Sequence, residues 1–194
     1  MPDAAILIDN AIVYIEAKAG LFDESFMTVG ATEVFTHKAR ALVEAVHQIQ
    51  QYASSSNAGS LHQIEQLNRF GLIITSREVG VKSGLALQEM LPAGKLVSPF
   101  ESGWPVALNH IYVLPIADFE RIANACTANG MKLCEFLRKC VTADSDAQSA
   151  VAFVEQHLRR LAFPEGFSAV VGQAIDAAGQ RLESAFEPTD TPNG

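Results

Sequence analysis

The strongest constraint on the fold of this chain lies in its first eighteen residues. Residues 4–8 (AAILI) and 11–18 (AIVYIEAK) are rich in Ile, Val and Tyr, which are typical of strands. Asp9 and Asn10 between them tolerate the left-handed conformation that a two-residue turn needs. The segment therefore predicts a β-hairpin with a fixed register, in which the numbers of facing residues add up to 19.

This register gathers three charged side chains. Asp3 faces Glu16, so both carboxylates point to one face of the hairpin, and strand alternation puts Lys18 on the same face. Facing carboxylates repel each other unless a cation or a proton separates them, and Mg²⁺ favours carboxylates together with waters and phosphate oxygens. The plainer alternative is a frayed Asp3 beside a solvated Glu16 and Lys18.

The rest of the chain predicts an α/β protein whose second half is mostly helical. Apolar periodicity and turn residues predict the following elements in the first half: a helix over 36–53, a short helix over 61–67, a strand over 71–76, a helix over 84–91 and a strand over 110–116. The second half predicts helices over 118–129, 131–140, 145–163 and 168–186. We expect an α/β core over 1–116, a helical extension packed on it over 117–186, and a disordered tail over 187–194.

Composition narrows the classes of function. The chain has 194 residues, of which 48 % are apolar and 19 % charged, enough to bury a core. The sequence has no long apolar run and no leader pattern, which predicts no membrane partner. Its three cysteines match no zinc or disulfide pattern, which is typical of a cytoplasmic protein. The net charge of −8 argues against nonspecific binding of nucleic acid. Lys18, Lys38 and Arg40 form either a local basic rim or solvated helix charges.

The hairpin carries a recognisable motif. Pro2-Asp3, then twelve residues, then Glu16-Ala17-Lys18 resembles the signature of the PD-(D/E)XK nuclease superfamily, and the order of hairpin, helix and strand matches as well. The resemblance covers residues 2–76 and implies a restriction-endonuclease-like mixed sheet with a crossover helix, followed here by the helical C-terminal part.

The resemblance also implies a site and a reaction. Asp3, Glu16 and the backbone carbonyl of Ala17 would be ligands of Mg²⁺ or Mn²⁺, and Lys18 the catalytic lysine. The implied activity is metal-dependent hydrolysis of phosphodiester bonds in nucleic acid, with DNA as the expected substrate.

A second motif lies on the predicted helix over 36–53. Gln48 and Tyr52 resemble the Gln-x-x-x-Tyr pair of the RecB-like exonuclease branch, and their spacing puts both on one helix face. With Lys38 they would bind substrate or support the site. The alternative is a polar helix edge with a core tyrosine. Trp104 and Phe100 are predicted in a loop, where they either stack on a base or fill the core.

One departure from the family leaves other functions open. The family core has a helix and an outer strand before the motif acid, whereas only Met1 precedes Pro2 here. Three explanations are open: the sequence is a fragment, its start is misplaced, or a homo-dimer or another partner covers the exposed hairpin edge, which is the arrangement we expect. Two alternatives remain: a catalytically silent member of the fold that acts as an interaction module, and an unrelated small α/β protein with a chance Glu-x-Lys.

Overall fold

A four-stranded mixed sheet forms the centre of the molecule. The computed structural model describes residues 3–8, 10–18, 31–55, 68–146 and 148–160, with side chains from residue 39 onward in the first helix. The strands are β1 (Ala4–Ile8), β2 (Ala11–Lys18), β3 (Asn68–Thr75) and β4 (Ile111–Pro115), and they lie in the order β1-β2-β3-β4. β1 is antiparallel to β2, whereas β2, β3 and β4 are mutually parallel. The α/β class expected from the sequence is confirmed.

The hairpin has the predicted register. Ala4 pairs with Ile15 and Ile8 with Ala11, so the numbers of facing residues add up to 19. Asn10 lies in the turn, while Asp9 falls outside the described residues. The strand expected over 71–76 corresponds to β3 and pairs beside β2, where Glu16 aligns with Ile73 and Lys18 with Thr75.

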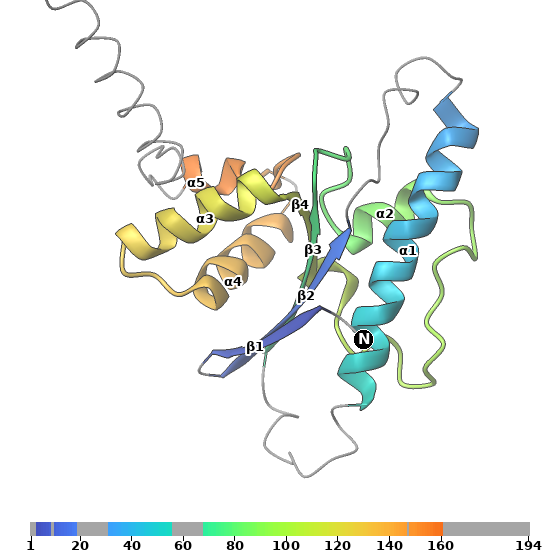
Figure 1. Ribbon diagram of the computed structural model, residues 1–194, viewed down its shortest axis with the longest axis horizontal. Helices are drawn as coiled ribbons and strands as arrows, with labels where there is room; N and C mark the ends of the chain where they lie inside the picture. The colour runs from blue at the N-terminus through green and yellow to red at the C-terminus, as the bar shows by residue number, and fades with distance from the viewer. Residues whose placement is uncertain (1–2, 9, 19–30, 56–67, 147, 161–194) are drawn as a thin grey trace, which may run out of the picture.

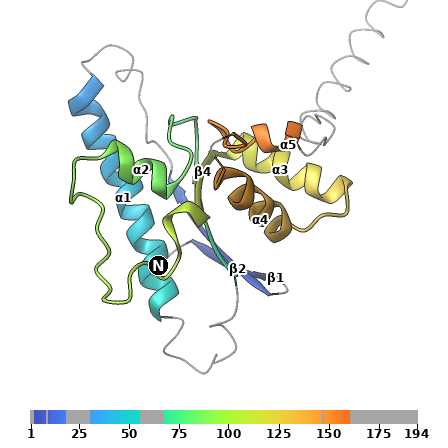
Figure 2. The same ribbon diagram turned by 180° about the vertical axis from the view of Figure 1, so that it is seen from behind.

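Helices cover both faces of the sheet (Figures 1 and 2). One face carries α1 (Ala31–Ser55) and α2 (Gly84–Met90), and the other carries α3 (Ile116–Ala128) and α4 (Leu133–Asp144), with α5 (Gln156–Arg160) beside them. A single-turn 3₁₀ helix, η3 (Leu108–His110), precedes β4.

Each face has its own apolar core. On the α1 face, the apolar residues Leu42, Val46 and Ile49 of α1 are buried in one core with Ile12 and Ile73 of the sheet. On the other face the alternate strand residues pack against α3 and α4, and all three cysteines are buried there as free thiols. The alternation along β2 therefore separates the two faces, and it decides which helices each side chain meets.

Helix boundaries differ from the sequence prediction, most of all after α4. α1 starts five residues before the predicted residue 36. α4 continues to Asp144. The described residues 145–146 and 148–155 are not helical, so only α5 represents the predicted helix over 145–163 in the described part. Ser and Asp side chains explain the break: Ser149 Oγ donates to the carbonyl of Ala143 over 2.6 Å, and Asp146 accepts from the backbone of Gln148. The predicted helices over 61–67 and 168–186, and the predicted tail, lie outside the described residues.

The outer edge of β1 has no strand beside it among the described residues. Ile6 and Leu7 of this strand are 39 % and 68 % exposed, so the edge is both apolar and accessible in the described part of the chain. The expected homo-dimer or partner at this edge stays a prediction.

A partly buried polar cluster around Asp144 connects the C-terminal helices to the sheet. Asp144 at the end of α4 accepts from Lys82 Nζ over 2.9 Å and from the Tyr112 hydroxyl of β4 over 3.3 Å. His157 Nε2 of α5 lies 3.3 Å from the same carboxylate without meeting hydrogen-bond geometry. Burial raises the pKa of Asp144, but the contacts with His157 and Lys82 outweigh burial and lower it from 3.8 to about 2.

We predict that Asp144→Asn lowers the free energy of unfolding by about 2 kcal/mol at neutral pH, because the partly buried Lys82 ammonium loses its counter-charge. Since the folded pKa of Asp144 is lowered, its contribution is complete above pH 4 and is lost as the pH falls toward 2. The difference in the free energy of unfolding between wild type and Asp144→Asn should therefore become smaller as the pH falls from 4 toward 2. Urea unfolding at several pH values measures it, with Glu44→Gln of the exposed Arg40–Glu44 pair as the control that changes little.

Candidate functional site

The candidate site lies where the carboxyl end of β2 meets α1. Tyr14 faces α1 in the core of that side, so strand alternation puts Glu16 and Lys18 on the same side. Asp3 directly precedes β1 and, by continuation of the register, faces Glu16. The hairpin therefore places Asp3, Glu16 and Lys18 at the end of the sheet that α1 covers.

Lys18 is the centre of the site. Its Nζ lies 2.6 Å from Glu16 Oε1 and 2.8 Å from Gln48 Oε1 of α1. An ammonium group only donates, so both oxygens accept from it, and the two contacts hold the lysine head between strand and helix. The predicted Gln48 is thus in direct contact with the predicted lysine, although the two are thirty residues apart in the sequence.

Glu16 is more buried than expected. An open site would leave both Glu16 and Lys18 partly exposed, yet Glu16 is 3 % exposed and the Lys18 side chain 20 %. α1 covers the end of β2 and removes the carboxylate from water. Glu16 Oε1 is paired with Lys18, whereas the buried Oε2 has no hydrogen-bond partner among the described residues. A buried carboxylate oxygen of this kind is costly unless a cation, a proton or a water satisfies it.

Asp3 joins the site from the exposed edge. Its Oδ2 accepts a hydrogen bond from the backbone N–H of Ala17 over 2.7 Å. The carboxylate thereby extends the β1–β2 ladder by one bond beyond the end of β1. The N–H and C=O of one strand residue point to the same edge, so the carbonyl of Ala17 points toward the Asp3 side as well. The predicted third metal ligand therefore lies at the same edge as the motif acid.

The other two predicted residues lie on α1. Tyr52 is half-buried and packs its ring edge-on against Tyr14, with ring centroids 5.8 Å apart. It therefore lies against the apolar core of the α1 face, one helical turn from Gln48. Lys38 is on α1, but its side chain is outside the described residues.

Thr75 is a site neighbour that the sequence interpretation missed. It ends β3 in register with Lys18, on the same face of the sheet, and is 2 % exposed. Its hydroxyl donates to the carbonyl of Arg77 over 2.7 Å, which fixes the turn that leaves the strand. The available signal was the polar Thr-Ser end of an otherwise apolar strand, because parallel neighbours end at the same edge of a sheet.

The described residues contain no group of three or more His, Cys, Asp or Glu side chains placed to hold a metal ion. A metal at this site would therefore depend on two carboxylates and a backbone carbonyl, with waters or substrate oxygens as the remaining ligands, as Mg²⁺ accepts.

No protein-family model matches this chain, and comparison with curated proteins and with solved structures also finds no match. No helix in the described part of the chain has the length and apolar character that crossing a bilayer requires.

We predict strong energetic coupling between Glu16 and Lys18. Lys18→Met leaves a buried carboxylate without its cation, so it should destabilise the protein by about 3 kcal/mol, and Glu16→Gln should relieve much of this loss in the double variant. A double-mutant cycle by urea unfolding should give a coupling free energy of about 2 kcal/mol.

The exposed Glu135–Lys139 pair on α4, with N and O atoms 3.3 Å apart, is the matched control for this cycle. Both of its side chains are nearly half exposed, so its coupling should be a small fraction of that of the buried pair. Equal coupling in the two cycles would contradict the structural role of the Glu16–Lys18 contact.

Proposed function

We propose that this protein is a metal-dependent nuclease with a restriction-endonuclease-like core. The observation that carries the proposal is the convergence of Glu16, Lys18 and Gln48 at the end of β2, with Asp3 at the adjacent edge. These residue types come from two separate motifs in the sequence, and a chance Glu-x-Lys gives no reason for a glutamine from a distant helix to contact the lysine.

The site has the donors that a hard cation needs. Asp3, Glu16 and the carbonyl of Ala17 would hold Mg²⁺ or Mn²⁺, and the buried Oε2 of Glu16, which lacks a described partner, supports this assignment. When bound, the ion would polarise a phosphoryl oxygen and lower the pKa of a water molecule.

Lys18 would orient the attacking water and stabilise charge that develops on the phosphate. Gln48 would fix the direction of the ammonium group through its Oε1. The substrate would be nucleic acid, with DNA as the expected form.

A second candidate function is supported by the same contacts. Asp3 Oδ2 is engaged with the backbone of Ala17, and Glu16 Oε1 with Lys18, so each carboxylate already has a partner within the protein. A catalytically silent member of the same fold would keep its charged side chains paired in this way. Such a protein would act as an interaction or accessory module.

A cleavage assay separates the two candidates. With Mg²⁺ or Mn²⁺, the wild-type protein should cut single- or double-stranded DNA or RNA, and EDTA should stop the reaction. Lys18→Ala should lower the rate by about a hundredfold or more, because a positioned proton-transfer group contributes that much. Lys139→Ala, which removes a half-exposed lysine of α4 far along the chain, is the matched control and should cut as the wild type does.

Both variants must be compared as folded proteins, since the loss of Lys18 also costs stability. Circular dichroism at the assay temperature provides that check. If the folded wild type is as inert as Lys18→Ala, the silent module is the better description; if Lys18→Ala cuts as fast as the wild type, the assignment of the site is wrong.

A further inference from the structure

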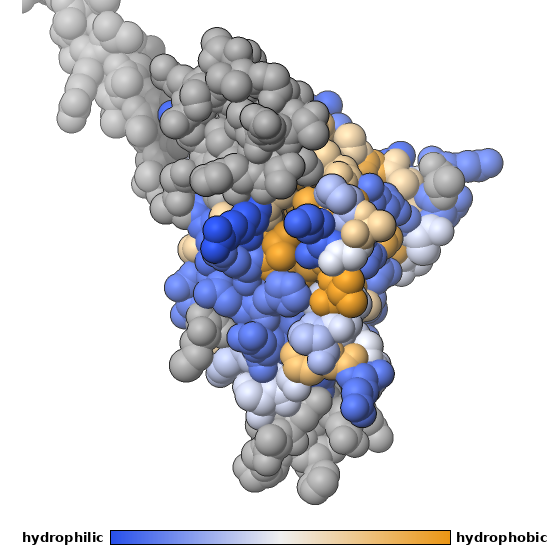
Figure 3. Space-filling view, turned by 90° about the vertical axis from the view of Figure 1, so that its right-hand side faces the viewer, coloured by the Kyte–Doolittle hydropathy of each residue, from blue (hydrophilic) through white to orange (hydrophobic). Residues whose placement is uncertain are grey.

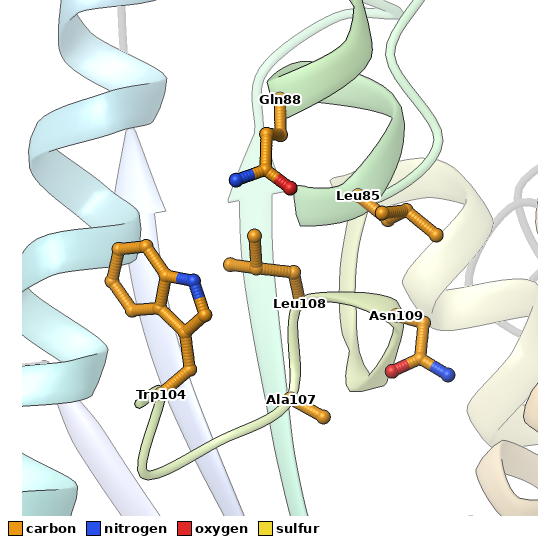
Figure 4. Close-up of a pocket in the computed structure, with 6 residues that line it drawn as sticks. All are labelled: Leu85, Gln88, Trp104, Ala107, Leu108 and Asn109. Carbon is orange, nitrogen blue, oxygen red and sulfur yellow. The ribbon is translucent and has the colours of Figure 1, made fainter. Parts of the chain in front are cut away.

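An open groove lies on the α1 face of the sheet, outside the candidate site. Its volume is about 350 Å³, within the range of small-ligand sites. The groove is formed by α2, η3 and the loop before η3 (Figure 4). Its lining residues are Leu85, Gln88, Trp104, Ala107, Leu108 and Asn109. The groove thus combines an indole, an apolar floor and two carboxamides, and none of these six side chains carries a charge.

The wall that carries Trp104 is held rigidly. Gln50 of α1 is fully buried, and its carboxamide makes two hydrogen bonds with the backbone of Val106: Nε2 donates to the carbonyl over 2.6 Å and Oε1 accepts from the N–H over 2.8 Å. The indole also lies 5.8 Å, between ring centroids, from the ring of His47 on α1. Trp104 is therefore placed in advance of any ligand, which lowers the entropic cost of binding.

The floor of the groove is equally constrained. A Cβ atom on Gly84, the first residue of α2, would lie 3.0 Å from the carbonyl oxygen of Leu108. The absence of a side chain at Gly84 therefore lets α2 approach η3 closely. Leu108 is 6 % exposed and lies between Trp104 and Leu85 in Figure 4, so it forms the floor between the two ends of the groove.

The polar groups suit a neutral, planar ligand. Gln88 Nε2 donates to the carbonyl of Leu96 over 3.1 Å, so the amide is oriented and its oxygen can accept a hydrogen bond. Asn109 is exposed at the opposite end from Trp104 and offers both a donor and an acceptor (Figure 4). Carboxamides pair with the edges of bases, and aromatic rings stack on their faces. Without a cationic residue, the groove is not suited to a phosphate.

We infer that this groove binds one unstacked base of single-stranded nucleic acid, with the base stacked on Trp104. The inference rests on the proposed nuclease function, and it assigns to that substrate a contact outside the reacting centre. α1 contributes a residue to each region: His47 lies beside Trp104, and the next residue, Gln48, contacts Lys18. On the side of the molecule that carries α1, apolar side chains gather in an area bordered by hydrophilic ones (Figure 3), so this side also offers apolar surface.

Recognition through a base also agrees with the charge of the chain. The net charge of −8 gives the chain as a whole no attraction for phosphates, and stacking supplies affinity that does not depend on positive charge. Single strands offer free base faces, whereas a duplex keeps them stacked, so the groove would favour single-stranded nucleic acid or frayed ends.

Trp104 is the only tryptophan of the chain, so its fluorescence reports on the groove directly. The wild-type protein is titrated in EDTA, which prevents cleavage, with a single-stranded deoxyadenosine decamer and with an abasic decamer of the same length. We expect the decamer to quench the fluorescence and the abasic strand to have little effect. In anisotropy titrations of a labelled decamer, Trp104→Ala should weaken binding about tenfold and Trp104→Phe less, since stacking on one aromatic ring contributes about that much.

The control variant is Met90→Ala, which removes another exposed apolar side chain outside the groove lining and should bind as the wild type does. Equal quenching by the base-bearing and abasic strands, or no change with either, would overturn the inference. It would also be overturned if an apolar peptide quenched the fluorescence and the decamer did not, because the groove would then dock a protein.

The inference and the proposed nuclease activity fail separately. Base-dependent quenching by a protein that never cuts supports the groove and leaves the silent accessory module as its context. Cleavage that depends on Lys18, without any base-dependent change at Trp104, overturns the groove and leaves the nuclease proposal intact.

Discussion

The position of the Lys18 ammonium group is the constraint on which the rest of the site depends. It lies between the carboxylate of Glu16 on its own strand and the carboxamide of Gln48 on the covering helix. Without it, a carboxylate that is 3 % exposed would lie buried without a cation, at a cost of several kcal/mol. The contact agrees with the rotation of α1 that its buried apolar stripe sets, since Gln48 reaches Lys18 from only one helix face.

α1 also connects the candidate site with the groove on this face. Gln48 reaches the end of β2, His47 contacts Trp104, and the buried Gln50 holds the loop at Val106. Three side chains within four consecutive residues therefore connect the site, the groove and the core. On the opposite face, Asp144 has the corresponding role: it joins α4 to β4 through Tyr112 and to the segment before α2 through Lys82.

The hairpin could be predicted in detail because its information is local. A two-residue turn fixes the register, and strand period fixes the face of each side chain, so the neighbourhood of Asp3, Glu16 and Lys18 follows from sequence alone. The contact of Gln48 with Lys18 needed the motif as well, since no local rule sets the rotation of a crossover helix on a sheet.

Other features could not be predicted because they depend on tertiary contacts. Glu16 is buried because α1 closely covers the end of β2. Thr75 lies beside Lys18 because two parallel strands are aligned at that point. The helix predicted after Asp144 fails because short polar side chains capture backbone groups there, a competition that apolar periodicity does not record.

The central claim is that the carboxylates of Asp3 and Glu16 form a cation site beside Lys18. Anomalous diffraction from crystals of the wild-type protein soaked in Mn²⁺ tests it most directly. The account predicts one strong peak within coordination distance of Glu16 Oε2 and the Asp3 carboxylate, which disappears in Glu16→Gln. A well-ordered site with no peak there at saturating Mn²⁺, or with Mn²⁺ bound only elsewhere, would contradict it.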